Sequence, residues 1–366
     1  MKAVFLSTPE TLELRDVPAR REAEAHEVLL EPLIVGLGGN DVLHYRQGAP
    51  VQDGFRRPMI SGSEFVARVV AIGRGVDPTL LGQRVVASPV SPCQRCEWCA
   101  EGYQNLCPNS RTLGVPPTAG AMQQRFSWPA VLCVRVAEKV PNHQAVLLVP
   151  LSLAIHVADH ANIPLMGSVA VLGCGHLGLL LIKTLRASGV GTILAVDGVP
   201  YRREAALQAG ATHAVDPTAA EDLARTLPRS GVDVAIDVTN SSAGSRTAVS
   251  LTKIGGRVIL AGIPDDNRIF FSALEARRRE LVIQFVNRPH NTLRRAEALL
   301  ESGALGDLDW MVTHRFPLEQ VADAFRLIRR MKDGVIKCLV EMPAYAPAEE
   351  SPDSVARAAV QATASA

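Results

Sequence analysis

The stretch VLGCGHLG, residues 171–178, decides the fold of this chain. Its glycines are spaced G-x-G-x-x-G, after a β-rich run and before a helix-like run. In such a loop the first glycine permits a tight turn, the second lets the backbone approach a pyrophosphate, and the third lets the helix pack on the strand. A helix N-terminus also attracts anions. We therefore predict a dinucleotide site rather than a glycine turn without a ligand, on the loop residues Gly173, Gly175, His176, Leu177 and Gly178.

An acidic residue follows at the end of the next strand-like run, TILAVD, where Asp197 stands. A carboxylate at this point hydrogen-bonds a ribose 2′-hydroxyl and repels a 2′-phosphate. The position favours NAD(H) over NADP(H). Arg202 and Arg203 lie close enough in sequence to soften that preference, and we include Arg202 among the cofactor-binding candidates.

The pattern of strand-like and helix-like runs changes at about residue 151. Residues 1 to about 150 hold short β runs separated by Gly and Pro, which is typical of a barrel-like β unit. From residue 151, strand-like runs alternate with helix-like ones, a βαβ pattern that predicts a parallel sheet. The fold class is therefore α/β. The Ala/Ser/Pro-rich tail, residues 346–366, is predicted to be disordered.

Composition excludes several classes of protein. The chain has 366 residues, 47% of them hydrophobic, and a formal net charge of +1, so neither nucleic acid nor an anionic membrane is an expected partner. Residues 161–182 lack Asp, Glu, Lys and Arg, but a proline and four glycines divide them into a strand and a helix. The N-terminus lacks a secretory pattern, so we expect a cytoplasmic protein.

Four of the seven cysteines lie in CQRCEWCAEGYQNLC, residues 93–107. Their spacing is C-x2-C-x2-C-x7-C. Four thiolates from one loop close a tetrahedral zinc shell with no open position, which makes the ion structural rather than catalytic. An iron–sulfur cluster and disulfide pairing are the alternatives. We predict one structural zinc on Cys93, Cys96, Cys99 and Cys107.

A β-rich N-terminal half with this lobe, followed by a Rossmann half, resembles the zinc-type medium-chain dehydrogenase/reductase family. The stretches HNTLRRAEALL (290–300) and VTHRFPLE (312–319) look most like its sorbitol, or polyol, dehydrogenase branch. The resemblance implies a GroES-like catalytic domain at 1–150 with the zinc lobe at about 93–107. It also implies a Rossmann NAD-binding domain at 151–295, a return to the catalytic domain at 296–345, and a homodimer or homotetramer.

The same resemblance exposes a difference in the cleft. Relatives take catalytic-zinc ligands from motifs like G-I-C-G-S-D, G-H-E and E-P-L-S, which here read GLGGND (36–41), GSE (62–64) and VPLS (149–152). The three ligand positions are thus Gly38, Ser63 and Val149. Glycine and valine offer no ligand atom and a serine hydroxyl is a poor one, so we predict no catalytic zinc. A replacement shell from Asp41, His44, Glu64 and His156 is the alternative.

Without a Lewis acid in the cleft, oxidation of an unactivated alcohol is disfavoured, whereas hydride addition to a polarised acceptor needs less help. We therefore expect a zinc-independent nicotinamide reductase of a conjugated carbonyl, an enone, in a small polar or cyclitol-like substrate. A zinc-independent polyol dehydrogenase and a non-catalytic NAD-binding sensor or scaffold are the alternatives. The candidate catalytic residues are Asn40, His44, Tyr45, Ser63 and Arg288.

Overall fold

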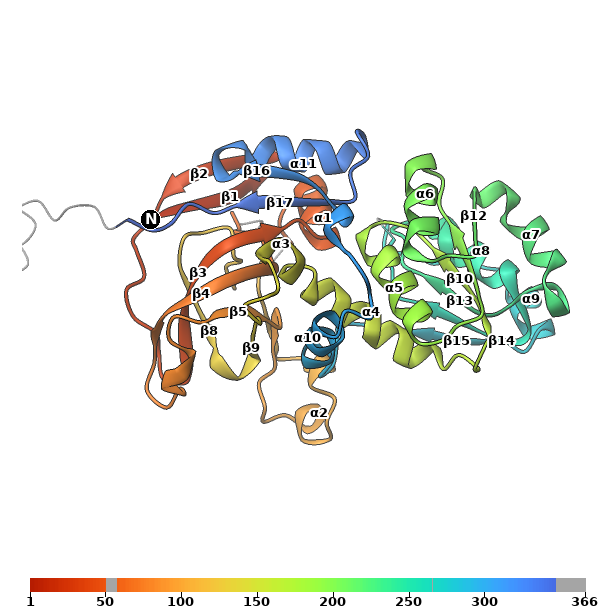
Figure 1. The fold of residues 1–366 in the computed structure, drawn as a ribbon, viewed down its shortest axis with the longest axis horizontal. Coiled ribbons are helices and arrows are strands. Elements are labelled where there is room, and N and C mark those ends of the chain that lie inside the picture. Colours follow the sequence, from red (N-terminus) through yellow and green to blue (C-terminus); the bar gives the residue numbers. More distant parts are fainter. Residues whose placement is uncertain (51–57, 265, 347–366) are drawn as a thin grey trace, which may run out of the picture.

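The computed structural model describes residues 1–50, 58–264 and 266–346, and it confirms the expected α/β architecture. Figure 1 shows two bodies side by side, a β-rich catalytic unit and a Rossmann unit, with helix α4 (Leu148–Ala161) between them. The tail predicted to be disordered lies, from residue 347 onward, outside the described residues.

The Rossmann unit is built on a six-stranded parallel sheet in the order β12-β11-β10-β13-β14-β15. Its central strands are buried apolar runs, as expected where helices cover both faces. The strands are β10 (Ser168–Leu172), β11 (Thr192–Val196), β12 (His213–Val215), β13 (Val232–Asp237), β14 (Thr252–Leu260) and β15 (Val282–Phe285). The helices are α5 (His176–Ala187), α6 (Pro200–Ala209), α7 (Ala220–Thr226), α8 (Ser242–Leu251) and α9 (Ala273–Arg278).

The catalytic unit holds a sheet in the order β16-β17-β3-β4-β5-β9, with β8 also paired to β3. Its strands are β3 (Glu27–Gly36), β4 (Glu64–Ile72), β5 (Arg84–Ala87), β8 (Phe126–Pro129), β9 (Cys133–Arg135), β16 (Val312–Pro317) and β17 (Lys337–Glu341). Two smaller sheets pair β1 (Lys2–Thr8) with β2 (Thr11–Asp16) and β6 (Val90–Ser91) with β7 (Arg111–Thr112). The helices are α1 (Gly39–Gln47), α2 (Glu97–Ala100), α3 (Asn142–Ala145), α10 (Leu293–Glu301) and α11 (Val321–Arg330).

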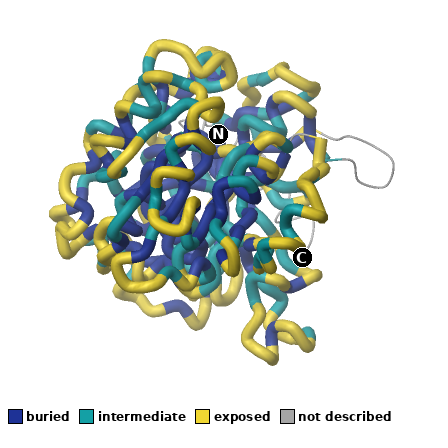
Figure 2. Tube along the Cα trace, turned by 90° about the vertical axis from the view of Figure 1, so that its right-hand side faces the viewer, coloured by how far each residue is buried: buried dark blue, intermediate teal, exposed yellow. Residues whose placement is uncertain are grey.

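Helix α4 joins the hydrophobic cores of the two units. Its residues pack in one cluster with β10 and α5 of the Rossmann unit and with apolar residues of the catalytic unit. The stretch Asn142–Ala161 is long and apolar enough to cross a membrane, but 72% of its most apolar window is buried inside the molecule, which identifies it as a core helix. Figure 2 shows such buried segments gathered inside a shell of exposed loops. The uncharged residues 161–182 form β10 and the start of α5, as expected.

Strand register brings three distant segments to one edge of the catalytic sheet. Gly36, the last residue of β3, pairs with Glu64, the first residue of β4, and with Leu339 of β17. The loop after β3, the loop before β4 and the start of β17 therefore meet there. The N-terminus of α5 lies across from this edge, because His176 reaches Glu64.

Candidate functional site

The glycine loop after β10 has the geometry that a dinucleotide needs. Gly173 has φ +91, a left-handed conformation that favours glycine. A Cβ on Gly178 would collide with the carbonyl oxygen of Gly173, so the third glycine is required for helix α5 to pack on the strand. Gly175 differs, because nothing lies within 4 Å of where its Cβ would be. That open space above the helix N-terminus fits a pyrophosphate.

Asp197 is fixed at the end of β11, beside this loop. Its Oδ2 accepts a hydrogen bond from the Cys174 amide (2.7 Å) and its Oδ1 accepts one from the Val199 amide (2.8 Å). These bonds hold the carboxylate at the mouth of the loop, where sequence reasoning expects the adenine ribose.

The two arginines after Asp197 differ in their contacts. Arg203 donates to the Asp197 carbonyl oxygen (2.9 Å) and to the Asp216 carboxylate (3.4 Å), so its guanidinium is already engaged. Arg202 lies near the Tyr201 ring, and among the described residues its buried Nε has no hydrogen-bond partner. Of the two arginines, Arg202 is therefore the one with a guanidinium donor that lacks a hydrogen-bond partner among the described residues.

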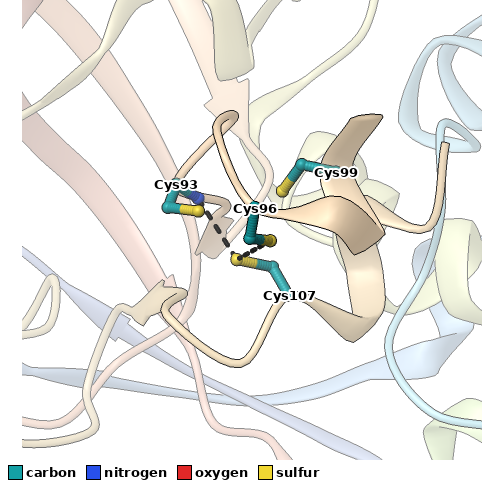
Figure 3. A group of neighbouring side chains, drawn as sticks. All are labelled: Cys93, Cys96, Cys99 and Cys107. Atoms are coloured by element: carbon teal, nitrogen blue, oxygen red, sulfur yellow. Dashed lines mark hydrogen bonds between the residues drawn. The ribbon is translucent and has the colours of Figure 1, made fainter. Parts of the chain in front are cut away.

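The four cysteines of the lobe gather as predicted. Figure 3 shows their side chains around α2, and the four sulfur atoms lie within 4.8 Å of one another. The Sγ atoms of Cys96 and Cys107 are 3.8 Å apart. A tetrahedral shell with Zn–S bonds of about 2.3 Å separates its sulfurs by about 3.8 Å, so the set fits zinc. In the part of the chain that the structure describes, it is the one cluster of three or more His, Cys, Asp or Glu with metal-ligand spacing.

The edge of the catalytic sheet is crowded at Gly38, where the first missing zinc ligand is expected from the sequence. A Cβ on Gly38 would lie inside van der Waals contact of the Glu64 Oε1 atom and 3.5 Å from the Asp41 Oδ2 atom. The Glu64 carboxylate therefore occupies the space that a side chain at position 38 would need. Val149 is buried in α4, and Ser63 is half-buried directly before β4.

Glu64 is paired with Lys337, the first residue of β17. The Lys337 ammonium contacts the Glu64 Oε2 atom and donates to the Leu37 carbonyl oxygen at 2.9 Å, and its side chain is 0% exposed. Burial alone would raise the pKa of the Glu64 carboxyl. The Lys337 charge and the His176 ring outweigh that effect and lower the pKa to about 2. Glu64 is thus a satisfied, ionised carboxylate within the protein.

Asp41 holds the two glycine loops of this edge together. Its Oδ2 accepts from the Gly38 amide and its Oδ1 from the Gly62 amide, both at 2.9 Å. Burial, with the Glu64 charge nearby, raises the pKa of Asp41 to about 6. Both carboxylate oxygens of Asp41 accept hydrogen bonds from backbone amides, so this side chain links the two loops.

Helix α1 sorts the candidate catalytic residues onto two faces. Asn40 is exposed and His44, one helical turn later, is half-buried, and burial lowers the pKa of His44. Tyr45 shares the buried face with Asp41 and is 3% exposed, with its ring 4.9 Å from that of Phe325. Burial raises the pKa of the Tyr45 phenol. The placement favours His44 over Tyr45 as a group that meets a substrate.

Arg288 lies beside the zinc lobe. Its Nη1 donates to the Ser110 hydroxyl at 2.8 Å, and its carbonyl oxygen accepts from Asn105. His156, considered above for a replacement metal shell, packs edge-to-face against His160, with the ring centroids 4.6 Å apart. Burial and the His160 ring lower the pKa of His156 to about 4. The described residues therefore do not bring that shell together.

Sequence reasoning missed Lys337. It stands between Ile336 and Cys338 at the start of the strand KCLVE, whose first four residues are buried, and a charge among such residues is a signal that it has a partner inside the molecule. Sequence reasoning also placed His176 only as part of the cofactor loop. The structure shows that its ring reaches the catalytic unit as well, with Nε2 3.8 Å from the Glu64 Oε1 atom.

Comparison with known proteins agrees with this geometry. Residues 24–138 match the family model of the alcohol dehydrogenase GroES-like domain, and residues 177–302 match that of the zinc-binding dehydrogenases. Sorbitol dehydrogenase of Bacillus subtilis strain 168 is 30% identical over 343 residues, covering 93% of this chain and 97% of that protein.

Two solved structures extend the comparison. A short chain alcohol dehydrogenase of Escherichia coli CFT073, complexed with NADH, is 26% identical with a TM-score of 0.82, covering 93% of this chain and 99% of that one. A zinc-binding dehydrogenase of Sinorhizobium meliloti 1021, bound to NADP, is 27% identical with a TM-score of 0.83, covering 93% and 98%. The chain belongs to the zinc-type medium-chain dehydrogenase/reductase family. It is an NAD(P)-dependent oxidoreductase with a four-cysteine structural zinc site.

Proposed function

We propose that this oxidoreductase works without a metal ion in its cleft and reduces a conjugated carbonyl in a small polyhydroxylated substrate. The observation that carries the proposal is the arrangement around Gly38. The Glu64 carboxylate fills the space beside Gly38, and its negative charge is paired with the Lys337 ammonium. Where a catalytic metal would need three ligands, this edge supplies a glycine, a serine and a valine.

Reduction is proposed rather than oxidation because of what a site without a metal ion can stabilise. A metal would polarise a carbonyl or lower the pKa of a bound alcohol, which contributes several kcal/mol of transition-state stabilisation. Neutral donors such as the Asn40 amide and the Ser63 hydroxyl recover part of that, because they stabilise the oxyanion of an enolate. Hydride addition to an enone carbon, with charge spread onto oxygen, suits such a site better than removal of hydride from a plain alcohol.

The substrate class rests on the relatives. Matched proteins are named sorbitol dehydrogenase in Bacillus subtilis and L-idonate 5-dehydrogenase in Vitis vinifera, the latter 29% identical over 314 residues. Both names describe small polyhydroxylated molecules. We infer a substrate of the same size and polarity. We also propose that Arg288, which donates to the Ser110 hydroxyl beside the zinc lobe, contacts the substrate.

The names of these relatives also favour a second candidate, oxidation of a polyol without zinc. That reaction needs a base for the hydroxyl proton. Glu64 is unsuited, because its pKa is lowered to about 2, whereas burial keeps the His44 ring neutral and able to accept a proton.

One set of assays tests these functions. The protein is assayed with NADH or NADPH against a hydroxylated 2-cyclohexenone, and with NAD⁺ or NADP⁺ against sorbitol, before and after a brief chelator treatment that leaves the lobe zinc in place. We expect enone-dependent oxidation of NADH that the chelator does not change. Faster turnover of sorbitol would establish the second candidate. Cofactor binding with no turnover would indicate a sensor, and activity lost to the chelator would reveal a labile metal and end the metal-free proposal.

We propose that NAD(H) is preferred over NADP(H), because the Asp197 carboxylate stands at the mouth of the loop. The Arg202 guanidinium, whose Nε has no partner among the described residues, would attract a 2′-phosphate and so favour NADP(H). Asp197→Ser should narrow the discrimination by roughly tenfold or more, the value of one hydrogen bond to a charged group. Comparing the Kd values of NADH and NADPH for the two proteins measures this. A wild type that already prefers NADPH would give Arg202 the dominant role.

We propose a homodimer formed through β15, which is the edge strand of the Rossmann sheet. An exposed apolar edge is a template for pairing with another chain. The exposed apolar residues on and near it are Ile254, Phe270, Phe271, Leu274, Val282 and Phe285. Phe285→Lys should shift the mass in solution, measured by light scattering, toward the monomer. The proposed localisation is cytoplasmic, with a small-molecule substrate and neither nucleic acid nor membrane as partner.

A further inference from the structure

His176 is the residue at which the cofactor loop meets the catalytic unit. It is the first residue of α5, and its ring nitrogen Nε2 lies 3.8 Å from the Glu64 Oε1 atom of β4. Both side chains are largely enclosed, at 18% and 11% exposed. The contact joins segments that are 112 residues apart in sequence, one from the Rossmann unit and one from the catalytic unit.

Charged groups from three elements face this ring. They are Glu64 on β4, Lys337 on β17 and Arg202 on α6. Burial lowers the pKa of His176, and the charges of Lys337 and Arg202 lower it further, whereas Glu64 acts in the opposite direction. The net direction is downward from 6.5, so the ring is predominantly neutral at neutral pH. Against a neutral ring, the 3.8 Å contact with Glu64 is weak.

A bound dinucleotide would change this balance. Its phosphates carry negative charge to the N-terminus of α5, where the open space at Gly175 receives them and where His176 is the first residue. Negative charge near an imidazole favours its protonated form. The imidazolium would then face Glu64 as a true ion pair.

We propose that His176 takes up a proton when the dinucleotide binds and, as an imidazolium, pairs with Glu64, so that it clasps the catalytic unit to the cofactor-bearing loop. The proposal rests on the dinucleotide binding that the family supplies and deepens it. It gives the His176 side chain a proton-dependent part in dinucleotide binding, in addition to the contacts that the loop backbone makes with the phosphates.

Linkage fixes the sign of the pH dependence. The group gains a higher pKa in the complex than in the free protein, so affinity for the dinucleotide is greatest at low pH. It falls as pH rises between the pKa of the free protein and that of the complex. Because one proton is involved, the Kd of the dinucleotide rises by at most tenfold per pH unit.

Isothermal titration calorimetry of the full chain with NADH tests the proposal. Titrations at one neutral pH in phosphate, HEPES and Tris buffers give the number of protons taken up, from the dependence of the binding enthalpy on the ionisation enthalpy of the buffer. We expect a positive uptake of up to one proton per NADH. His176→Asn should abolish the uptake and flatten the pH dependence of Kd, and His176→Gln serves as a second neutral variant.

His314→Asn, on β16, is the matched control and should keep the wild-type uptake. The proposal is overturned if the wild type binds NADH with no proton uptake. It is also overturned if uptake persists in both His176 variants, which would assign it to another group such as His44 or Asp41. Failure of the wild type to bind any dinucleotide would instead contradict the oxidoreductase function itself.

Discussion

The zinc lobe and the cleft edge belong to the same catalytic unit, yet they differ in how much of the family pattern they keep. The lobe retains all four cysteines, and their sulfur atoms gather within 4.8 Å. From the sequence, the three ligands of a catalytic zinc are expected at Gly38, Ser63 and Val149, and the first two flank the edge of the catalytic sheet. The lobe has four sulfur ligands that fit a closed zinc shell, whereas the edge beside Gly38 holds an internal ion pair.

The contrast teaches that a glycine at the edge of a sheet need not leave an empty space beside it. Glu64 lies against Gly38, and Lys337 satisfies its charge. A buried ion pair is weak evidence for net stability, because the desolvation of two charges offsets their attraction. Removing one partner is costly all the same.

The largest effect we predict is loss of the lobe metal. Cys96→Ser should reduce the zinc content from one per chain to none and lower the free energy of unfolding by more than about 4 kcal/mol, because metal binding is coupled to folding of the lobe. Elemental analysis and chemical denaturation measure both. Cys133→Ser, a buried cysteine outside the lobe, is the control and should keep its zinc. Metal lost without loss of stability would show the lobe to be dispensable.

The next effect tests the cleft edge in the same way. Lys337→Met should destabilise the protein by roughly 3–5 kcal/mol, because it leaves the Glu64 carboxylate buried without its partner. Adding Glu64→Gln removes that charge and should restore much of the loss. Denaturant unfolding of the two single variants and the double variant forms the cycle. Strictly additive losses would mean that the pair does not act as a unit.

Acid should weaken the same pair. The pKa of Glu64 is lowered from 4.5 to about 2, so its contribution is fully present above pH 4.5 and is lost as pH falls through 2. The amount is on the order of 3 kcal/mol. Unfolding measured between pH 5 and pH 2 should therefore show a loss for the wild type that is smaller in the Lys337→Met, Glu64→Gln double variant. Equal acid sensitivity of the two proteins would assign the loss to other carboxylates.

A smaller effect compares two adjacent glycines. Gly38→Ala should cost roughly 1–3 kcal/mol, because its methyl group would overpack against the Glu64 carboxylate that Lys337 holds in place. Gly39→Ala is the matched control. Nothing lies within 4 Å of its Cβ position, and alanine favours the helix that begins there. A neutral Gly38→Ala would show that Glu64 moves away easily, and that a thiol at this position could be accommodated.

Sequence predicted the features that rest on local spacing. The glycines of residues 173–178, the four cysteines and the alternation of strands and helices each lie within one segment, and the structure confirms them. The Glu64–Lys337 pair joins residues 273 apart, and only the register of β3, β4 and β17 brings them together. No local pattern contains that register.

Tyr45 shows a different kind of limit. Sequence reasoning named both His44 and Tyr45 as candidate catalytic residues, but adjacent residues of a helix point to different faces. The four-residue spacing from Asp41 to Tyr45 puts both on the buried face, and Asn40 and His44 share the other. Helical periodicity was sufficient to separate them once the helix was known to begin at Gly39.

The smallest effect we predict concerns that tyrosine. Its ring packs on Phe325 of α11, and the charges of Glu10, Arg326 and Arg329 act on its hydroxyl. Tyr45→Phe keeps the ring, so the rate of NADH oxidation and its pH profile should stay within about twofold of the wild type. His44→Asn should shift the profile, because it removes a titrating group from the other face of α1. The two variants are compared in pH–rate profiles with the best substrate from the assays above. A profile altered by Tyr45→Phe and not by His44→Asn would reverse the assignment, and it would require the phenol of Tyr45 to reach the substrate from within the core.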